Sequence, residues 1–360
     1  MATLRPLRES DVDDLVAASN DSLIQLYVPS LPAPYTSDHA LWWITRGVPE
    51  VVDKGGFVWA IADPASDRLL GSVGLNPMFA GGAGRHSAAL GFWVAPWARQ
   101  RGLATDVTRQ VTAWAFEQGF PRLELGTRPE NALSQRVALA AGYRSEGIRQ
   151  AAERCRGGGW RDLLIWSRLP GDPPGPTPRL IPDAPVGGLS DGVVTLRPLS
   201  PGDTDDLFAL RTLPEVVASH VPSVTPSLES IERECALASA AWLAGSRVTM
   251  VIIEVSSGAF AGEIGLYYQE PITGQAMVGY ATVPTLRGRG HMTRAVNLLS
   301  EWAFSQVGVH RLIAGTHPDN GGSQRVLAKS GFVREGLQRS RLPGPGGNRI
   351  DDVLWARLPD

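Results

Sequence analysis

Two arginine- and glycine-containing segments carry the residues best suited to bind a ligand. They read Arg99-Gln100-Arg101-Gly102-Leu103-Ala104 and Arg287-Gly288-Arg289-Gly290-His291-Met292, and each lies between a predicted strand and a predicted helix. Glycine allows a tight turn and a close approach to a ligand, the start of a helix presents unpaired amides, and arginine adds charge-assisted hydrogen bonds. Together these features favour phosphate oxygens, so the two segments predict sites for a pyrophosphate.

A single segment of this kind is typical of an ordinary tight turn, and its repetition favours the binding interpretation. No Gly-x-Gly-x-x-Gly opens either helix, which argues against a Rossmann dinucleotide site. No Gly-Lys-Ser or Gly-Lys-Thr occurs, which argues against a Walker loop. A different kind of phosphate site is therefore expected.

The two segments belong to a duplication that covers most of the chain. Residues 90–105 pair with 278–293 at a constant offset of 188, and residues 122–137 pair with 311–326 at an offset of 189. Ten of the sixteen positions in the second pair are identical, and both halves open on Thr-Leu-Arg-Pro-Leu. So long a period indicates a duplicated domain, not a solenoid repeat.

The duplication predicts an N-terminal domain at residues 1–169 and a C-terminal domain at 193–360. Residues 170–192, between them, hold seven prolines and five glycines. Because proline fixes φ and removes a donor, this stretch is expected to be a semi-extended linker. Each domain is long enough to bury a core and fold alone.

Each half has the same predicted order of elements, which gives a mixed α/β fold with hairpins first and a βαβ-like crossover later. The predicted helices lie at 38–52, 105–117, 228–243 and 293–306, with two more ending at Gly142 and Gly331. The predicted strands lie at 57–62, 69–75, 89–94, 123–127 and 163–169, and at 249–255, 261–268, 277–282, 312–316 and 353–358. The run at 81–84 is expected to be a hairpin loop.

Composition excludes several classes of protein. A net charge of −2 offers no footprint for nucleic acid or anionic lipid. No run of about 18 apolar residues and no apolar signal core occur, so a soluble, cytoplasmic protein is expected. Neither the two cysteines nor the six histidines have metal-ligand spacing, so no metal is expected.

The sequence resembles the GNAT family of N-acetyltransferases, and most closely the RimJ/RimL-like branch that modifies the N-termini of ribosomal proteins. The resemblance rests on Thr-Leu-Arg-Pro-Leu, a glycine-aromatic strand, Arg-x-x-Gly-x-Ala/Met followed by threonine, and Pro-Glu/Asp-Asn-x-x-Ser. It covers both halves and implies two GNAT domains, each with a mixed, mostly antiparallel sheet that is splayed between strands 4 and 5 and flanked by helices. Met292 departs from the family motif, and Arg294 replaces the acidic residue that Asp106 supplies in the first half.

The resemblance implies acetyl-CoA as cofactor, with its diphosphate on the loop amides and its pantetheine arm between the splayed strands. An amide near Val94 or Thr282 would polarise the thioester carbonyl. Asn131 and Asn320 would face the arm, while Ser134 and Ser323 would protonate the leaving thiolate; the alternative that these residues only cap the next helix stays open. The implied cofactor-binding residues are Val94, Arg99, Gln100, Arg101, Gly102, Leu103, Ala104, Thr105 and Asn131, and Thr282, Arg287, Gly288, Arg289, Gly290, His291, Met292, Thr293 and Asn320.

The acceptor amine must be neutral to attack. An α-amine has a pKa near 7.8 and a lysine near 10.4, so deprotonating lysine costs about 3.5 kcal/mol more. Glu124 and Glu263 are candidate bases, acting through water, although carboxylates on strands are usually only solvated. The expected acceptor is therefore the N-terminal amine of a peptide or protein.

Two alternatives remain open, neither of which involves nucleic acid or a membrane. The acceptor is a small-molecule amine such as an antibiotic or its precursor, or one half is a non-catalytic module that binds acyl-CoA or shapes the substrate site. The two halves are expected to pack as an intramolecular pseudo-dimer.

Overall fold

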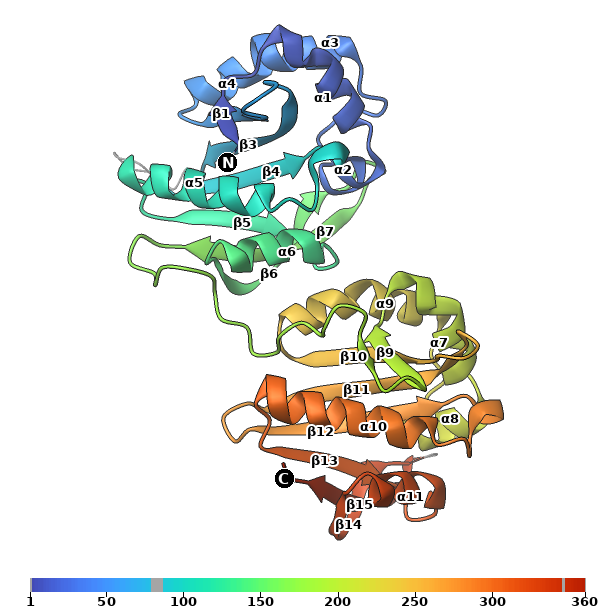
Figure 1. Cartoon of the computed structure of the whole chain (residues 1–360). Coiled ribbons are helices and arrows are strands. Elements are labelled where there is room, and N and C mark those ends of the chain that lie inside the picture. The colour runs from blue at the N-terminus through green and yellow to red at the C-terminus, as the bar shows by residue number, and fades with distance from the viewer. Residues whose placement is uncertain (1, 79–86, 345–346, 360) are drawn as a thin grey trace. The chain divides into compact units, whose positions relative to one another are not determined.

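The computed structural model describes residues 2–78, 87–344 and 347–359, and the predicted loop at 81–84 lies outside them. The chain forms two compact units, Met1–Pro178 and Arg179–Asp360 (Figure 1). Each unit contains a mixed sheet flanked by helices, which confirms the predicted fold class.

The sheet of the N-terminal unit has the strand order β1-β2-β3-β4-β5-β7-β6. Its neighbours are antiparallel except for β4 and β5, which run parallel. The strands are β1 Thr3–Arg5, β2 Phe57–Ala62, β3 Leu69–Pro77, β4 Ala88–Val94, β5 Leu123–Thr127, β6 Arg144–Arg154 and β7 Trp160–Arg168.

Helices cover this sheet, and α5 lies beside β4 and β5 (Figure 1). Val107, Val111 and Ala115 recur at every fourth residue of α5 and are all buried, so one apolar stripe holds the helix on the sheet. The helices are α1 Val12–Ser19, α2 Ser22–Tyr27, α3 Ser37–Trp42, α4 Val48–Asp53, α5 Leu103–Glu117 and α6 Ala132–Ala140.

The C-terminal unit repeats this architecture with the order β14-β15-β13-β12-β11-β10-β9-β8. Its strands are β8 Leu189–Ser190, β9 Val194–Pro198, β10 Arg247–Glu254, β11 Phe260–Glu270, β12 Gln275–Thr282, β13 Arg311–Thr316, β14 Val333–Pro343 and β15 Arg349–Arg357. Its helices are α7 Thr204–Arg211, α8 Pro214–Ser219, α9 Leu228–Leu243, α10 His291–Trp302 and α11 Gly321–Lys329.

The two parallel strands of each sheet pair over a short distance only. The β4–β5 ladder consists of Ala88 with Leu123 and Ala89 with Glu124. The β12–β13 ladder ends at Met277, opposite Ile313. Beyond these pairs the strands share no ladder, so each sheet is open between its central strands, as the resemblance implies.

Strongly apolar elements occur where they are predicted, whereas a long exposed strand is missed in each unit. β2, β5 and α9 have the predicted bounds. β6 and β14 are not predicted because their side chains are mostly exposed and show no apolar alternation. The helix predicted at 38–52 is divided into α3 and α4 by a π-helical turn at Trp43–Gly47.

The segment predicted as a linker is divided between the two units. Thr177 donates from its amide to the Leu139 carbonyl (2.8 Å) and from its hydroxyl to the Tyr143 carbonyl (2.8 Å) in the N-terminal unit. Ile181 is fully buried in the C-terminal unit, where the carbonyl of Pro182 accepts a hydrogen bond from an indole. Both ends of the segment therefore pack on the unit that they adjoin.

Candidate functional site: two glycine loops and an acceptor cavity

Both predicted phosphate loops have the same backbone geometry. Gln100 and Gly102 have φ values of 62° and 74°, and Gly288 and Gly290 have values of 79° and 82°. Such positive φ values are uncommon outside glycine, so Gln100 is the exception among the four. Alternating left-handed residues turn successive amides toward one side, which forms a concavity suited to an anion.

The loop amides are available to a ligand. The first helical hydrogen bonds that return to the loops run from Asp106 to the Gly102 carbonyl and from Arg294 to the Gly290 carbonyl, both at 3.1 Å. Within the described ranges, the amides of residues 100–105 and 288–293 have no acceptor. Each loop therefore presents free donors at the positive end of a helix dipole.

The arginines of the N-terminal loop have different partners. Arg99 donates to Asp21, the N-cap residue of α2, at 2.5 Å and 3.4 Å. Burial raises the pKa of Asp21, but the Arg99 guanidinium and two backbone amides outweigh burial and hold that pKa below its usual range. Arg101 forms no ion pair with any described residue, so its guanidinium is available to a phosphate.

The C-terminal loop is tied to an acidic side chain of β10. Glu254 lies 3.5 Å from Arg289 and 3.2 Å from His291 Nε2. His291 is buried, and among the described residues its Nδ1 has no hydrogen-bond partner. Met292, also buried, belongs to the core of this unit, and Arg287 lies 3.8 Å from Glu215.

A cavity of about 1010 Å³ joins the N-terminal loop to the residues around α1 and α3. At one end it is lined by the loop and by the first turns of α5 and α6: Arg99, Gln100, Gly102, Leu103, Ala104, Thr105, Asn131 and Ser134. At the other end it is lined mainly by aromatic and small polar side chains: Ser19, Tyr27, Tyr35, His39, Trp42, Trp43, Ser72 and Trp93. Phe57 and Trp59 of β2 contact Trp114 of α5, whereas Val58, between them, packs in the cluster of α1 and α3. Because successive side chains of a strand point to opposite faces, the two groups lie on opposite faces of the sheet, and the cavity passes the opening between β4 and β5.

In each unit, a backbone amide faces the opening between the two parallel strands, which are β4 and β5 in one unit and β12 and β13 in the other. The amide of Ala88 bonds toward β5 (3.1 Å) and that of Ala95 toward β3 (2.8 Å). Because successive amides of a strand point to opposite edges, the Val94 amide faces β5 beyond the end of the ladder. The Val283 amide likewise bonds toward β11 (3.0 Å), which leaves the Thr282 amide facing β13.

The two Asn-x-x-Ser motifs cap their helices in the same way and differ at the serine hydroxyl. Asn131 accepts from the Ser134 amide at 3.2 Å, and Asn320 accepts from the Ser323 amide at 3.0 Å. The Ser134 hydroxyl lines the cavity and has no described partner, whereas the Ser323 hydroxyl lies 2.8 Å from that of Tyr280. Burial raises the pKa of Tyr280 to about 12. Helix capping thus explains the presence of the two asparagines. It does not explain the serine side chains, because the caps use the backbone amides of the serines and not their hydroxyls.

Both carboxylates predicted as bases are held in ion pairs. Glu124 lies 3.0 Å from Arg122 and 3.3 Å from Arg149, and it is not among the residues that line the cavity. Glu263 is buried, and both of its oxygens accept from Arg211 at 2.6 Å. Glu124 is therefore not beside the cavity of its own unit, and both oxygens of Glu263 are engaged by Arg211.

Several cavity residues were missed by sequence reasoning because they occupy positions at which the two halves differ. Glu153 is the single carboxylate among the lining residues that the structure describes, and its Oε2 accepts from Arg128 at 2.5 Å. Ser19 and Ser72 also line the cavity. No motif marked these four residues; only the position of Arg128 directly after β5 could have indicated a place near the opening.

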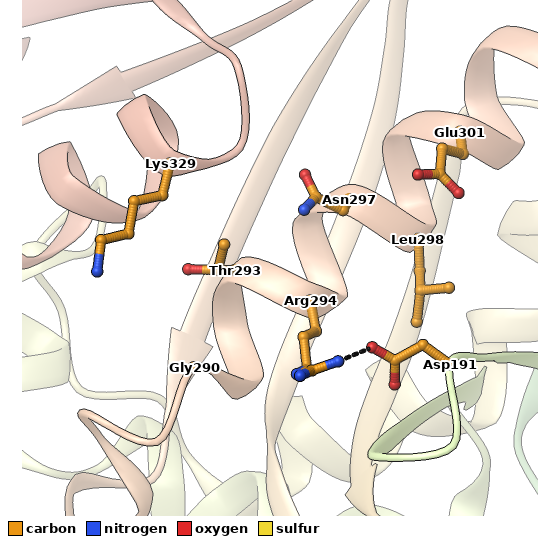
Figure 2. Close-up of a pocket in the computed structure, with 8 residues that line it drawn as sticks. All are labelled: Asp191, Gly290, Thr293, Arg294, Asn297, Leu298, Glu301 and Lys329. Carbon is orange, nitrogen blue, oxygen red and sulfur yellow. Dashed lines mark hydrogen bonds and ion pairs between the residues drawn. The ribbon is translucent and has the colours of Figure 1, made fainter.

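A second cavity, of about 520 Å³, lies beside α10 in the C-terminal unit (Figure 2). Gly290 and Thr293, which belong to the predicted phosphate site, form part of its wall. In Figure 2 the Arg294 side chain points toward Asp191, with which it forms an ion pair of 2.7 Å. Lys329, the last residue of α11, also lines the cavity. Two cations therefore lie near the start of α10, and one of them is already paired.

The described residues contain no group of three His, Cys, Asp or Glu side chains that could hold a metal ion. Within the same residues, no helix is both long and apolar enough to cross a bilayer.

Comparison with known proteins gives matches in both units. A family model described as "Acetyltransferase (GNAT) domain" matches residues 2–144 and again 194–333. The "Probable N-acetyltransferase YjcK" of Bacillus subtilis (strain 168) is 43% identical over 85 residues, which cover 24% of this chain and 47% of that protein. The chain thus spans about half the length of this relative.

Other matches extend over nearly one unit. The "Uncharacterized N-acetyltransferase p20" of Bacillus licheniformis is 26% identical over 167 residues, which cover 46% of this chain and 92% of that protein. A solved structure of Mycobacterium smegmatis RimJ in complex with CoA-disulfide is 26% identical and covers 46% of this chain and 82% of that one, with a TM-score of 0.42.

Proposed function

The chain belongs to the GNAT acetyltransferase family, and we propose that it transfers the acetyl group of acetyl-CoA to a primary amine. The observation that carries this proposal is the cavity of the N-terminal unit, which joins a loop of free amides to an aromatic-lined space past the opening between β4 and β5. A coenzyme at one end and an amine at the other would meet at this opening.

The coenzyme would be held by backbone donors. The free amides of residues 100–105 would bind its diphosphate, assisted by Arg101 and by the dipole of α5. The loop at 288–293 offers the same donors in the C-terminal unit. When bound, acetyl-CoA supplies an acetyl thioester that an amine can attack directly.

Two groups of the N-terminal unit would assist the transfer. The Val94 amide, which faces the opening, would donate to the thioester oxygen as negative charge develops on it; one such donor accounts for about 3–4 kcal/mol in other enzymes. As the C–N bond forms and the thioester C–S bond breaks, the amine nitrogen loses one proton. The Ser134 hydroxyl would donate its proton to the departing thiolate and take up the proton that the nitrogen releases, so that CoA leaves as a thiol. Asn131 fixes the start of α6. Ser323 and the Thr282 amide are the counterparts in the C-terminal unit.

The acceptor would be a weakly basic amine on an apolar body. Among the described residues that line the cavity, the one carboxylate is Glu153, which is paired with Arg128; none of them therefore offers a free carboxylate to deprotonate a lysine or to hold a polycation. An N-terminal α-amine, with its lower pKa, needs less help. The aromatic lining also fits a small apolar amine, which is the second candidate.

Release of free thiol from acetyl-CoA tests this proposal. The panel is a peptide amide with an apolar N-terminus (Ala-Phe-Leu-Ala), the same peptide with an acetylated N-terminus and an added lysine, phenylalanine amide as a small apolar α-amine, and spermidine. We expect turnover with the first and third compounds and little with the others. If coenzyme binds and none of the four is acetylated, the proposed activity is wrong.

Two further features remain proposals. Cytoplasmic residence would give the protein access to acetyl-CoA. Packing of the two units as an intramolecular pseudo-dimer would be tested by small-angle scattering of the full chain.

A further inference from the structure

We propose that an amine is acetylated only in the N-terminal unit, and that buried ion pairs close the acceptor side of the C-terminal unit, which binds coenzyme without transferring the acetyl group. This inference rests on the proposed function and concerns its distribution between the two units. It depends on two pairs of equivalent positions in the two units. One pair lies on β3 and β11, and the other lies at the ends of α1 and α7.

The first pair is Ser72 and Glu263. Ser72 lies opposite Trp93 in the β3–β4 ladder, and Glu263 lies opposite Ala281 in the β11–β12 ladder. Trp93 and Ala281 are equivalent because they are separated by the offset of 188 that relates the two repeated segments. The small side chain that lines the N-terminal cavity is therefore replaced by a glutamate.

The second pair is Ser19 and Arg211. Each is the last residue of the eight-residue helix that follows the repeated Thr-Leu-Arg-Pro-Leu. Ser19 lines the same cavity as Ser72. Arg211 instead crosses to Glu263, with Nε and Nη2 donating to the two carboxylate oxygens at 2.6 Å each. Two serines that border a cavity in one unit thus correspond to a bidentate ion pair in the other.

Additional contacts fix this pair in place. Arg211 also donates to Glu234 on α9 at 2.6 Å and 3.1 Å, and Arg247 donates to the same carboxylate at 2.5 Å. The side chains of Arg211 and Glu263 are 11% and 7% exposed. We call these four residues the ion lock. An acceptor entering here would have to separate charges that are out of water, and it would leave them unpaired.

The coenzyme side of the C-terminal unit does not have this obstruction. Its loop keeps the two left-handed glycines and the free amides. The Ser323 hydroxyl, in contrast, is held by Tyr280, whereas Ser134 has no described partner. The two units therefore differ at the acceptor side and at the proton donor, whereas the backbone of the diphosphate loop keeps its positive φ values and its free amides.

Exchange of the two pairs in the full-length chain tests the inference. The double variant Ser19→Arg with Ser72→Glu transplants the pair into the N-terminal unit, and Arg211→Ser with Glu263→Ser removes it from the C-terminal unit. Ser19→Ala with Ser72→Ala is the matched control, because it removes both hydroxyls without filling the cavity. Acetylation of Ala-Phe-Leu-Ala amide gives the transfer rate, and calorimetric titration with CoA gives the number of coenzyme sites.

We expect two CoA sites in the wild type and in all three variants. Transfer should fall by about 100-fold or more in Ser19→Arg/Ser72→Glu, because the acceptor is displaced from the reacting geometry, and far less in the alanine control. It should stay at the wild-type rate in Arg211→Ser/Glu263→Ser. A full complement of CoA sites shows that a variant is folded.

The inference is overturned if Ser19→Arg/Ser72→Glu keeps most of the wild-type transfer, or if Arg211→Ser/Glu263→Ser loses it while both CoA sites persist. One CoA site in the wild type would also overturn it, because the C-terminal unit would then not bind coenzyme. Failure of the wild type to acetylate any compound of the panel refutes the proposed function instead.

Discussion

The two units share the geometry of the glycine loop and differ in the chemistry on the other side of the sheet. At the loop, Gly102 and Gly290 have nearly the same φ, and the same amides are free. On the acceptor side, one unit has a cavity bordered by aromatic rings and two serines, and the other has the ion lock. A site made from backbone groups constrains few side chains except glycine, whereas a site made from side chains can change completely while the fold is retained.

The comparison extends to a surface ion network near the start of each parallel strand. Arg122 binds both Glu124 and Glu146 in the N-terminal unit. Its counterpart Arg311 binds Gln275 (3.0 Å) and Glu335. The arginine thus has two carboxylate partners in the N-terminal unit and one carboxylate and one amide partner in the C-terminal unit. This difference concerns a surface ion network that includes Glu124, and it is separate from the difference between the acceptor sides.

The largest expected effect on transfer comes from adding a side chain at Gly102, in the N-terminal loop. Gly102→Val should lower kcat/KM by about 100-fold or more, because a branched residue is strained at a φ of 74° and would displace the amides that we propose bind the diphosphate. The added Cβ meets no atom within 4 Å, so the fold should tolerate the change better than the site does. Steady-state transfer and CoA titration measure the two effects.

Gly290→Val is the matched change, at a φ of 82°. It should remove one of two CoA sites and lower transfer much less than Gly102→Val does. Equal losses in the two variants would contradict a division of labour between the units.

The serine hydroxyls offer a second comparison. Ser134→Ala should lower kcat by about 100-fold, the usual scale for a positioned proton donor. The cap of α6 survives this change, because Asn131 accepts from the backbone amide of residue 134 and not from its hydroxyl. Ser323→Ala should have a much smaller effect on kcat. A Ser134→Ala enzyme with unchanged kcat would mean that the serine has no chemical role.

The ion lock should make the C-terminal unit sensitive to loss of one charge. Arg211→Leu leaves Glu263 buried without its partner and should destabilise this unit by about 3–5 kcal/mol. In thermal unfolding, the transition of this unit should move down by on the order of 10 °C. Arg211→Leu/Glu263→Leu should recover most of the loss, because the second change removes the unpaired charge. Equal stability of the single variant and the wild type would show that the ion lock is not desolvated.

The sequence was sufficient to predict the elements whose pattern is set by burial. β2, β5 and α9 are apolar or amphipathic along their whole length, and local periodicity defines their bounds. β6 and β14 could not be found in this way, because they are stabilised by pairing with the neighbouring strand and not by an apolar face. The glycine turns before α5 and α10 could be predicted because a left-handed turn before a helix favours glycine in the sequence, and their binding of a phosphate stays a prediction.

The acceptor side could not be predicted, because its residues meet only in the folded unit. Arg211 and Glu263 are 52 residues apart, and Arg128 and Glu153 are 25 residues apart. Neither pair has a spacing that marks a motif. The sequence identified Glu263 as a carboxylate near the central strands but carried no sign that Arg211 would engage both of its oxygens.

The smallest expected effect concerns acid stability of the N-terminal unit. Hydrogen bonds from Arg122 and Ser167 lower the pKa of Glu146 to about 2, from a model-compound value of 4.5. Because the folded-state pKa is the lower one, the stabilisation is complete above about pH 4.5 and is lost as the pH falls toward 2. Glu146→Gln removes this dependence, so the midpoint of unfolding of the variant should change less between pH 5 and pH 2.

The pH-dependent part of the free energy of unfolding that comes from Glu146 should be that of an exposed ion pair, roughly 1 kcal/mol or less, because the Glu146 side chain is 43% exposed. Glu335→Gln is the matched variant, since Glu335 binds Arg311 as Glu146 binds Arg122. Because Gln275 takes the place of a carboxylate in the second network, Arg311 has one carboxylate partner where Arg122 has two. Melting curves at several pH values, followed in both variants, should therefore show a change in the transition of the N-terminal unit only for Glu146→Gln. The same pH dependence in Glu146→Gln and the wild type would mean that Arg122 does not hold Glu146 in solution.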